Sequence, residues 1–417
     1  MCPFRRPITS PRGATMPVPS EFTEQAVRER SPEGTGLYAD FLDNDDLGRS
    51  LFAANPWLAA PDNDKPLPWD GERYWKTTVA RKHLYWSAIA LPEPTKDIRR
   101  MRRDLLEWGY CLIEDAMSDT QCATLYKRLV EQAAGERQAG VALGSPYGQY
   151  VNALVNKGDC FARCIEQDPE VVQAGPVIEQ LADEALGKGW ICHSFLAISA
   201  DPDRYPQRVH MDQGSLMPWI PAEAPMLLNT MYILEDVGEH NGGTLLIPGS
   251  HKTMAEGRRT GVVGALPPMV HLEARAGTIM VFDGRLLHAT GVNRTDKQRF
   301  VAIMAFIKPW MRQQENWVLT VKPEILRWAS PKLLHRMGFQ AMFSGGTVEG
   351  WGINYVNGQL GDPMARITAF REAIDAGRYQ RVGVLAPGTP AADPAHDYTL
   401  RSVISMAKDA MGDAWEA

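Results

Sequence analysis

The middle of the chain, residues 191–307, alternates short apolar runs with turn residues, a pattern that predicts β-strands. The apolar runs occupy 194–199, 226–234, 243–248, 277–282 and 299–307. The last run, R-F-V-A-I-M-A-F-I, is apolar at both odd and even positions, which is typical of a strand that is buried on both faces. Short strands joined by turns favour a jelly-roll barrel over alternating β-α units, so we predict a mainly β core with flanking helices, an α+β class.

Helical spacing flanks these strands on both sides. Apolar residues recur at helical intervals over 98–108, and Ser118 with Gln121 can form a capping box that begins a second helix. Further helices are expected at 176–186, 323–337, 364–374 and 400–411. We therefore divide the chain into an aromatic-rich extension that covers the core (1–95), a barrel core with N-terminal helices (96–320) and a helical C-terminal region (321–417).

Two histidines and one aspartate form the candidate chemical centre. His210 and Asp212 are two residues apart, so on one strand their side chains point to the same face. His288, from a different strand, would complete two imidazoles and one carboxylate, the ligand set of non-haem Fe(II) oxygenases. An H-x-D sequence also arises by chance, so its context decides the interpretation.

The context of His288 is a predicted hairpin. Asp283-Gly284 is a strong hairpin turn signal, and it lies between the apolar run 277–282 and R-L-L-H-A-T at 285–290. On the second strand of such a hairpin, His288 and Thr290 share a face.

Arg299 opens the doubly buried strand. A guanidinium in such a strand needs an anion, and its planar fork fits a carboxylate. No acidic residue adjoins Arg299 in the sequence. Its partner is therefore an external carboxylate or a distant Asp or Glu of the chain, and we expect the external one.

These segments resemble the phytanoyl-CoA dioxygenase family of Fe(II)/2-oxoglutarate-dependent oxygenases. H-M-D-Q-G at 210–214 is similar to its first ligand motif, and H-A-T-G-V-N-R-T at 288–295 to the segment with its second histidine, eleven residues before an arginine. Further similarity lies at 104–118, 241–252 and 308–316. The resemblance covers a little over half of the chain, from about residue 98 to about 339.

The resemblance implies a double-stranded β-helix (cupin-like) core. It implies that His210, Asp212 and His288 bind Fe(II), that Arg299 grips the distal carboxylate of 2-oxoglutarate, and that Thr290 hydrogen-bonds the same carboxylate. With O₂, such a site hydroxylates a C–H bond of a small organic molecule. Related halogenases carry Gly or Ala in place of the aspartate, so Asp212 favours an oxygenase. Asn229, on the predicted strand 226–234, is a candidate contact to 2-oxoglutarate.

Composition excludes several other classes. The net charge is −6 and no basic stretch is interleaved with aromatics, which argues against nucleic acid as a partner. No window approaches the roughly 18 apolar residues of a membrane span, and no signal-peptide core is present, so we expect a cytoplasmic protein. Tryptophans at 57, 69, 75 and 86 suggest an apolar or aromatic substrate. A homo-oligomer stays open, as does the alternative of a catalytically silent barrel that binds a ligand or protein.

Overall fold

The computed structural model describes residues 46–58, 78–202, 204, 206–213, 224–339, 355–356 and 359–360. The helices expected at 364–374 and 400–411 lie outside these residues. The division of the chain into three parts therefore stays a prediction.

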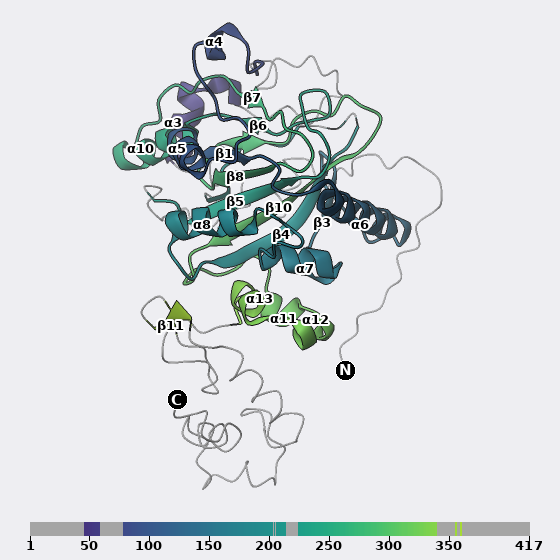
Figure 1. The fold of residues 1–417 in the computed structure, drawn as a ribbon. Coiled ribbons are helices and arrows are strands. Elements are labelled where there is room, and N and C mark those ends of the chain that lie inside the picture. The colour runs from purple at the N-terminus through teal and green to yellow at the C-terminus, as the bar shows by residue number, and fades with distance from the viewer. Residues whose placement is uncertain are drawn as a thin grey trace, which may run out of the picture.

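A seven-stranded antiparallel sheet is the largest element (Figure 1), with the strand order β1-β8-β5-β10-β4-β3-β2. Its strands are β1 (Tyr110–Ile113), β2 (Leu143–Gly144), β3 (Gln149–Val151), β4 (Ile191–Ala200), β5 (Leu227–Ile233), β8 (Ile279–Asp283) and β10 (Arg299–Ile307). Eight of the nine residues of β10 are buried, which confirms the prediction of a strand covered on both faces.

A smaller sheet, in the order β7-β6-β9, faces the large one. It consists of β6 (Leu245–Leu246), β7 (Val270–His271) and β9 (His288–Ala289), and an antiparallel bridge between His210 and His288 adds a fourth segment. Four neighbouring strands of the large sheet, β8-β5-β10-β4, thus lie opposite four short segments. This is the double-stranded β-helix that the sequence resemblance implied.

Helices lie on the outer sides of both sheets (Figure 1). The helices are α3 (Asp46–Ala54), α4 (Leu84–Ser87), α5 (Ile98–Trp108), α6 (Asp119–Gln138), α7 (Asp159–Ile165), α8 (Gly175–Leu186), α10 (Ser250–Thr260), α11 (Trp317–Thr320), α12 (Pro323–Trp328) and α13 (Pro331–Arg336), with 3-10 turns η2 (Pro56–Leu58) and η4 (Leu154–Asn156). A two-stranded pair, β11 (Tyr355–Val356) and β12 (Gln359–Leu360), follows.

The pleat of β10 divides the core into two halves. Phe300, Ala302 and Met304 pack in the cluster that contains the inner faces of α6, α7, α8 and α13. Val301 and Ile303, on the other face, pack in a cluster that includes Leu246 of the small sheet and so lies between the two sheets. Arg299 shares the face of Val301, because side chains two apart in a strand point the same way. The barrel interior is therefore on the Arg299 side of β10.

The predicted helix starts are largely confirmed. The Ser118 hydroxyl accepts from the Gln121 backbone N–H, and the Gln121 side chain accepts from the Ser118 backbone N–H. These two bonds complete the expected capping box of α6. The single helix expected over 323–337 is wrong: it is broken into α12 and α13. Pro331 lacks an N–H and disfavours a helical conformation at the residue before it, so a new helix begins there.

Residues 46–58 of the N-terminal extension pack on the outer side of the small sheet. Leu51 and Leu58 are buried in a cluster with Val209 and Met211, the two neighbours of His210. Asn55 donates to the Gly264 carbonyl (3.0 Å) and accepts from the Leu266 backbone (2.7 Å). The extension thus supports the strand segment that carries His210.

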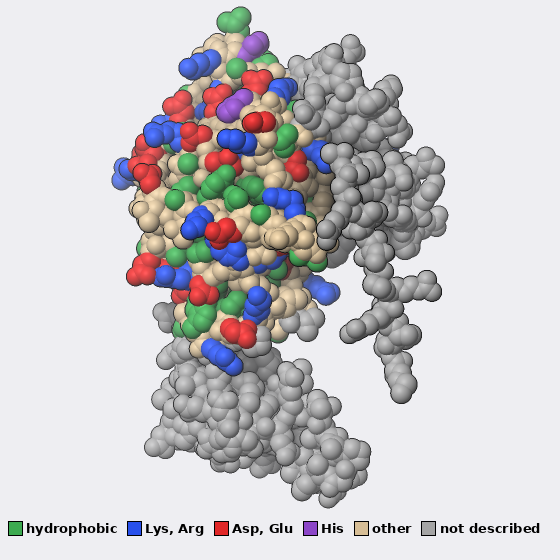
Figure 2. Space-filling model, turned by 90° about the vertical axis from the view of Figure 1, so that its right-hand side faces the viewer, with side chains coloured by type: hydrophobic (Ala, Val, Ile, Leu, Met, Phe, Trp, Pro, Cys, Tyr) green, Lys and Arg blue, Asp and Glu red, His purple; other side chains and the backbone are tan. Residues whose placement is uncertain are grey.

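Basic and acidic side chains are interspersed on the face shown in Figure 2. Among the described residues, no helix combines the length and apolar character needed to cross a membrane.

Candidate metal centre

Two histidines meet across the small sheet. The backbones of His210 and His288 exchange two hydrogen bonds, of 3.0 and 2.9 Å, and their ring centroids are 4.3 Å apart. Each residue of the trio His210, Asp212 and His288 offers a ligand atom, and these atoms lie within 4.8 Å of one another. Among the described residues this is the single cluster of that kind.

Asp212 joins the cluster from a helical turn. The expectation that His210 and Asp212 lie on one strand is therefore wrong, since the extended conformation ends before Asp212. The carboxylate still reaches both rings: Oδ1 is 3.4 Å from His210 Nε2 and Oδ2 is 3.6 Å from His288 Nε2. Because Asp212 lies in this turn rather than on the strand, its carboxylate points back toward the two bridged histidines.

Both imidazoles are oriented by local carbonyls. His210 Nδ1 lies 2.9 Å from the Arg208 carbonyl, and His288 Nδ1 lies 3.0 Å from the Leu286 carbonyl. A carbonyl only accepts, so each Nδ1 carries the hydrogen in the neutral ring. The Nε2 lone pairs then face Asp212 and are free to bind a metal, the arrangement that ligand histidines usually adopt.

Asn229 lies on β5 of the large sheet and forms a hydrogen bond with the Asp212 carboxylate. Its Nδ2 donates to Asp212 Oδ2 at 2.9 Å, and its side chain is 1% exposed. A contact between Asn229 and 2-oxoglutarate stays a prediction. The bond to Asp212 was not foreseen, because it joins residues whose proximity depends on the pairing of β5 with β8 and β10.

The three side chains of the cluster shift one another's pKa values. Burial and the neighbouring His210 lower the pKa of His288 to about 4, despite Asp212. Burial also disfavours charge on His210, but the hydrogen bond and the charge of Asp212 raise the pKa of His210 above its usual value. Although burial raises it, the pKa of Asp212 is brought down to about 2 by the two histidines and Asn229. An ionised carboxylate beside a neutral His288 is the state that binds a divalent cation.

The segment before His288 is a crossing between sheets. The expected hairpin is wrong: β8 pairs with β1 and β5 in the large sheet, whereas β9 pairs with β6 in the small one. Asp283 and Arg285 form a buried ion pair in this turn, with side chains 8% and 9% exposed. The turn signal at Asp283-Gly284 was correct, but the same turn chemistry serves a chain that changes sheets.

Arg299 is 2% exposed at the start of β10. Its Nε donates to the Asn241 carbonyl at 3.2 Å and its Nη2 donates to the Gly242 carbonyl. Burial lowers its pKa to about 10, against the attraction of Glu235. Glu235 accepts from the Phe300 backbone at 2.9 Å, and none of the carboxylates in the described ranges forms an ion pair with Arg299. The guanidinium therefore keeps N–H groups for an additional acceptor.

Thr290 belongs to a polar network that the sequence did not reveal. Its backbone N–H and hydroxyl both donate to Gln207 Oε1, at 3.2 and 3.0 Å. Gln207 Nε2 donates to the Tyr147 hydroxyl at 3.2 Å, and the hydroxyls of Tyr147 and Tyr150 are hydrogen-bonded to each other. The turn sequence S-P-Y-G at 145–148 was the available signal for this hairpin.

Other candidates for lining the site fall elsewhere. Tyr232 packs among the outer helices and contacts Gln167, so it does not line the metal cluster. Met217 and Trp219, which follow the H-M-D-Q-G segment in the sequence, lie outside the described residues. His193 accepts from the Gln314 backbone at 3.0 Å, and burial lowers its pKa to about 4. It is a core histidine whose ring is hydrogen-bonded to the backbone.

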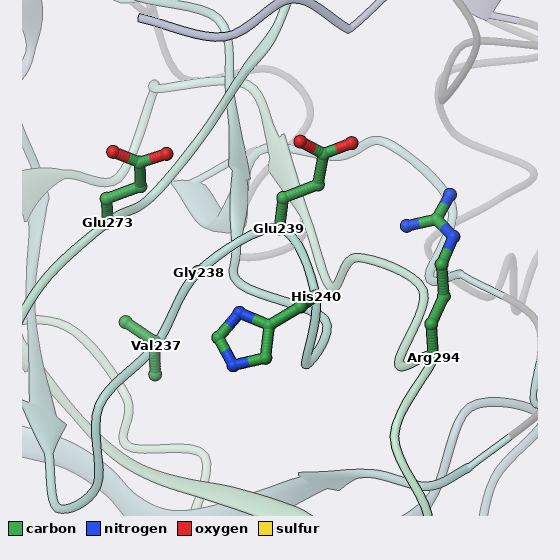
Figure 3. A pocket seen from close by; sticks show the side chains of 6 residues that line it. All are labelled: Val237, Gly238, Glu239, His240, Glu273 and Arg294. Atoms are coloured by element: carbon green, nitrogen blue, oxygen red, sulfur yellow. The ribbon is translucent and has the colours of Figure 1, made fainter.

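A separate surface hollow of about 500 Å³ lies near the β5–β6 loop (Figure 3). It is lined by Val237, Gly238, Glu239, His240, Glu273 and Arg294. Its four polar side chains are all exposed, and none belongs to the metal cluster. It lacks the buried, converging polar groups of a ligand site.

Several known proteins are similar to this chain in sequence. A model of the family described as phytanoyl-CoA dioxygenase matches residues 105–301. The dioxygenase af480 of Aspergillus fumigatus is 34% identical over 248 residues, which are 57% of this chain and 76% of that protein. The multifunctional dioxygenase prhA of Penicillium brasilianum is 26% identical over 203 residues, 43% of this chain and 65% of that protein.

Solved structures give weaker likenesses. The epimerase SnoN from nogalamycin biosynthesis is 20% identical with a TM-score of 0.40, over 54% of this chain and 89% of that one. HygX from Streptomyces hygroscopicus, with nickel and 2-oxoglutarate bound, is 12% identical with a TM-score of 0.40, over 52% and 89%. These scores are too low to transfer any feature of those sites. The family model and the 34% identical relative carry the assignment: this chain belongs to the phytanoyl-CoA dioxygenase family of Fe(II)/2-oxoglutarate-dependent oxygenases.

Proposed function

We propose that this protein is a dioxygenase in which His210, Asp212 and His288 hold Fe(II) and 2-oxoglutarate is the co-substrate. The observation that carries this proposal is the convergence of two Nε2 atoms and one carboxylate within 4.8 Å. The donor set fits the metal, since two imidazoles and one carboxylate suit Fe(II) and leave positions open. Both rings are already in the tautomer that metal binding needs.

The reaction is the hydroxylation of a C–H bond in a small organic substrate. The substrate, O₂ and 2-oxoglutarate give the alcohol, succinate and CO₂. Bound iron supplies the O₂ chemistry, as redox metals do in oxygenases of this ligand type. The chain positions the reactants and keeps water from the centre.

Each protein group has a defined task in this scheme. The carbonyls of Arg208 and Leu286 fix the two rings, and Asn229 fixes the plane of the Asp212 carboxylate. Arg299 binds the distal carboxylate of 2-oxoglutarate, because its remaining N–H groups form a fork for an anion. Thr290 is assigned to the same carboxylate by the sequence resemblance alone.

The test is anaerobic addition of Fe(II) and 2-oxoglutarate to metal-free protein, followed through the visible charge-transfer band of the chelate. We expect the band in the wild type and its loss in His288→Ala. With O₂ and a substrate, succinate release follows. A folded wild-type protein without the band would refute the proposal and favour a barrel that only binds a ligand.

Arg299→Ala separates the two halves of the proposal. The variant should bind metal normally but require more 2-oxoglutarate, by about tenfold or more for the loss of a charged hydrogen bond. An unchanged requirement would place Arg299 in the structure of the β5–β6 loop, where it already bonds two carbonyls.

A further inference from the structure

Gln213 follows Asp212 in the same helical turn and is 6% exposed. Successive residues of a helical turn point about 100° apart, so Gln213 does not share the direction in which Asp212 faces the two histidines. Its Oε1 accepts from the Met226 N–H at 2.8 Å, and its Nε2 donates to the Ala224 carbonyl at 3.1 Å. The side chain of Gln213 therefore binds the segment that leads into β5.

The backbone of Gln213 binds a third segment, the turn in which the chain crosses between the sheets. The Gln213 N–H donates to the Gly284 carbonyl at 2.8 Å, and the Gly284 N–H donates to the Leu227 carbonyl at 2.9 Å. A Cβ on Gly284 would lie 2.7 Å from Leu227 Cδ2, so the crossing turn lies directly against the first residue of β5. We call this set of contacts, formed by Gln213, Ala224, Met226, Leu227 and Gly284, the Gln213 junction.

The Gln213 junction joins the three segments that meet at the metal cluster. The helical turn carries Asp212, β5 carries Asn229, and the crossing turn leads to His288. Asp212 Oδ2 lies 2.9 Å from Asn229 Nδ2 and 3.6 Å from His288 Nε2. The junction therefore constrains the relative positions of the segments whose side chains meet at this oxygen.

The hydrogen bonds of Gln213 indicate a positioning role. Both polar groups of its side chain, Oε1 and Nε2, bind the backbone. A buried amide that is bonded at both groups stabilises one arrangement of the segments that it joins. An apolar residue of the same size would fill the space but would leave the Met226 N–H and the Ala224 carbonyl without this partner.

We propose that Gln213 is a positioning residue of the metal site, which holds the turn of Asp212 against β5 so that the carboxylate faces both histidines. The inference rests on the proposed function and adds to it a residue that acts on the metal through the backbone of its neighbours. Groups outside the ligand set that orient the ligands alter metal affinity by about 10–100-fold. Because Gln213 acts through the backbone, we expect the lower end of this range.

The test compares two buried glutamines that each form two side-chain hydrogen bonds. Gln213→Met keeps the approximate size of the side chain and removes its amide. Gln149→Met is the matched control, because Gln149 is 4% exposed, donates to the Ala133 carbonyl of α6 at 3.1 Å and accepts from Arg137. Metal-free wild type and both variants are titrated with Co(II), in place of Fe(II), by calorimetry. The visible spectrum of bound Co(II) reports the ligand geometry, and thermal unfolding reports stability.

Both variants should unfold at a lower temperature than the wild type, but only Gln213→Met should bind Co(II) about tenfold more weakly and with an altered spectrum. A folded Gln213→Met protein with wild-type affinity and spectrum, or an equal loss of affinity in Gln149→Met, would overturn the inference and leave the proposed function standing. A wild type that binds no Co(II) would overturn both. If Gln213→Met does not fold, Gln213→Asn, which keeps the amide but is one methylene shorter, is measured in the same way and judged by the same outcomes.

Discussion

Asn229→Leu is the sharpest test of how the metal cluster is built. The substitution keeps the approximate size of the side chain but removes the amide that donates to Asp212 Oδ2 at 2.9 Å. Asn229 is 1% exposed, so water cannot readily replace the lost donor. The carboxylate would then lose the neutral donor that helps to hold it in the plane facing both Nε2 atoms.

The magnitude follows from the charge of the acceptor. A hydrogen bond to a charged group contributes about 1.5–3 kcal/mol, and outer groups of this kind alter metal affinity by about 10–100-fold. The Asp212 side chain is 25% exposed, which weakens the effect. We therefore expect metal binding to weaken by about tenfold, toward the lower end of that range.

The assay is a titration of metal-free protein with Co(II), an air-stable substitute for Fe(II), by calorimetry. Thr230→Val is the matched control, because Thr230 is the next residue of β5 and donates on the opposite face to the Met304 carbonyl at 3.2 Å. It should lower the unfolding temperature but leave the Co(II) dissociation constant unchanged. A folded Asn229→Leu protein with wild-type Co(II) affinity would refute the role of this hydrogen bond.

Three further predictions follow from the described contacts. Co(II) affinity should fall about tenfold per pH unit below the raised pKa of His210, with a slope of one proton because His288 stays neutral down to about pH 4; a slope of two in a calorimetric pH series would contradict these assignments. Gly148→Ala should destabilise the protein by about 1–3 kcal/mol in urea unfolding, through the clash with Ser199, whereas Gly144→Ala, with open space around it, should not; equal effects would refute the close approach. Asp283→Ala should cost about 3 kcal/mol because it leaves Arg285 buried without this carboxylate, whereas Glu256→Ala in the exposed Arg259 pair should cost under about 1 kcal/mol; similar losses would contradict the burial argument.

Local signals predicted the parts of the fold that local chemistry determines. The capping box of α6 and the doubly apolar run of β10 depend on residues close in sequence, and both are as expected. The break at Pro331 was missed, although proline is common at the first position of a helix and gives a local signal there.

The features that could not be predicted from the sequence depend on the pairing of strands that lie far apart in the chain. The Asp283-Gly284 turn is identical in local chemistry whether the next strand returns to the same sheet or crosses to the other one. Only the partners of β8 and β9 decide this, and they lie far away in sequence. The same limit hid the bond from Asn229 to Asp212 and the contact of Tyr147, in the β2–β3 hairpin, with Gln207.

The metal cluster combines both kinds of determinant, and this explains why its residues were identifiable although its geometry was not. Each histidine is oriented by the carbonyl two residues before it, a contact that any chain with this local conformation can form. The distance between the two rings, however, depends on the bridge between His210 and His288, which joins segments 78 positions apart and exists only when the small sheet has formed. In the proposed function, metal binding would therefore be coupled to folding of the small sheet, since a ligand that binds only the folded arrangement stabilises it. Residues 46–58 of the N-terminal extension pack against the neighbours of His210, so their contacts act on the same bridge from outside the barrel.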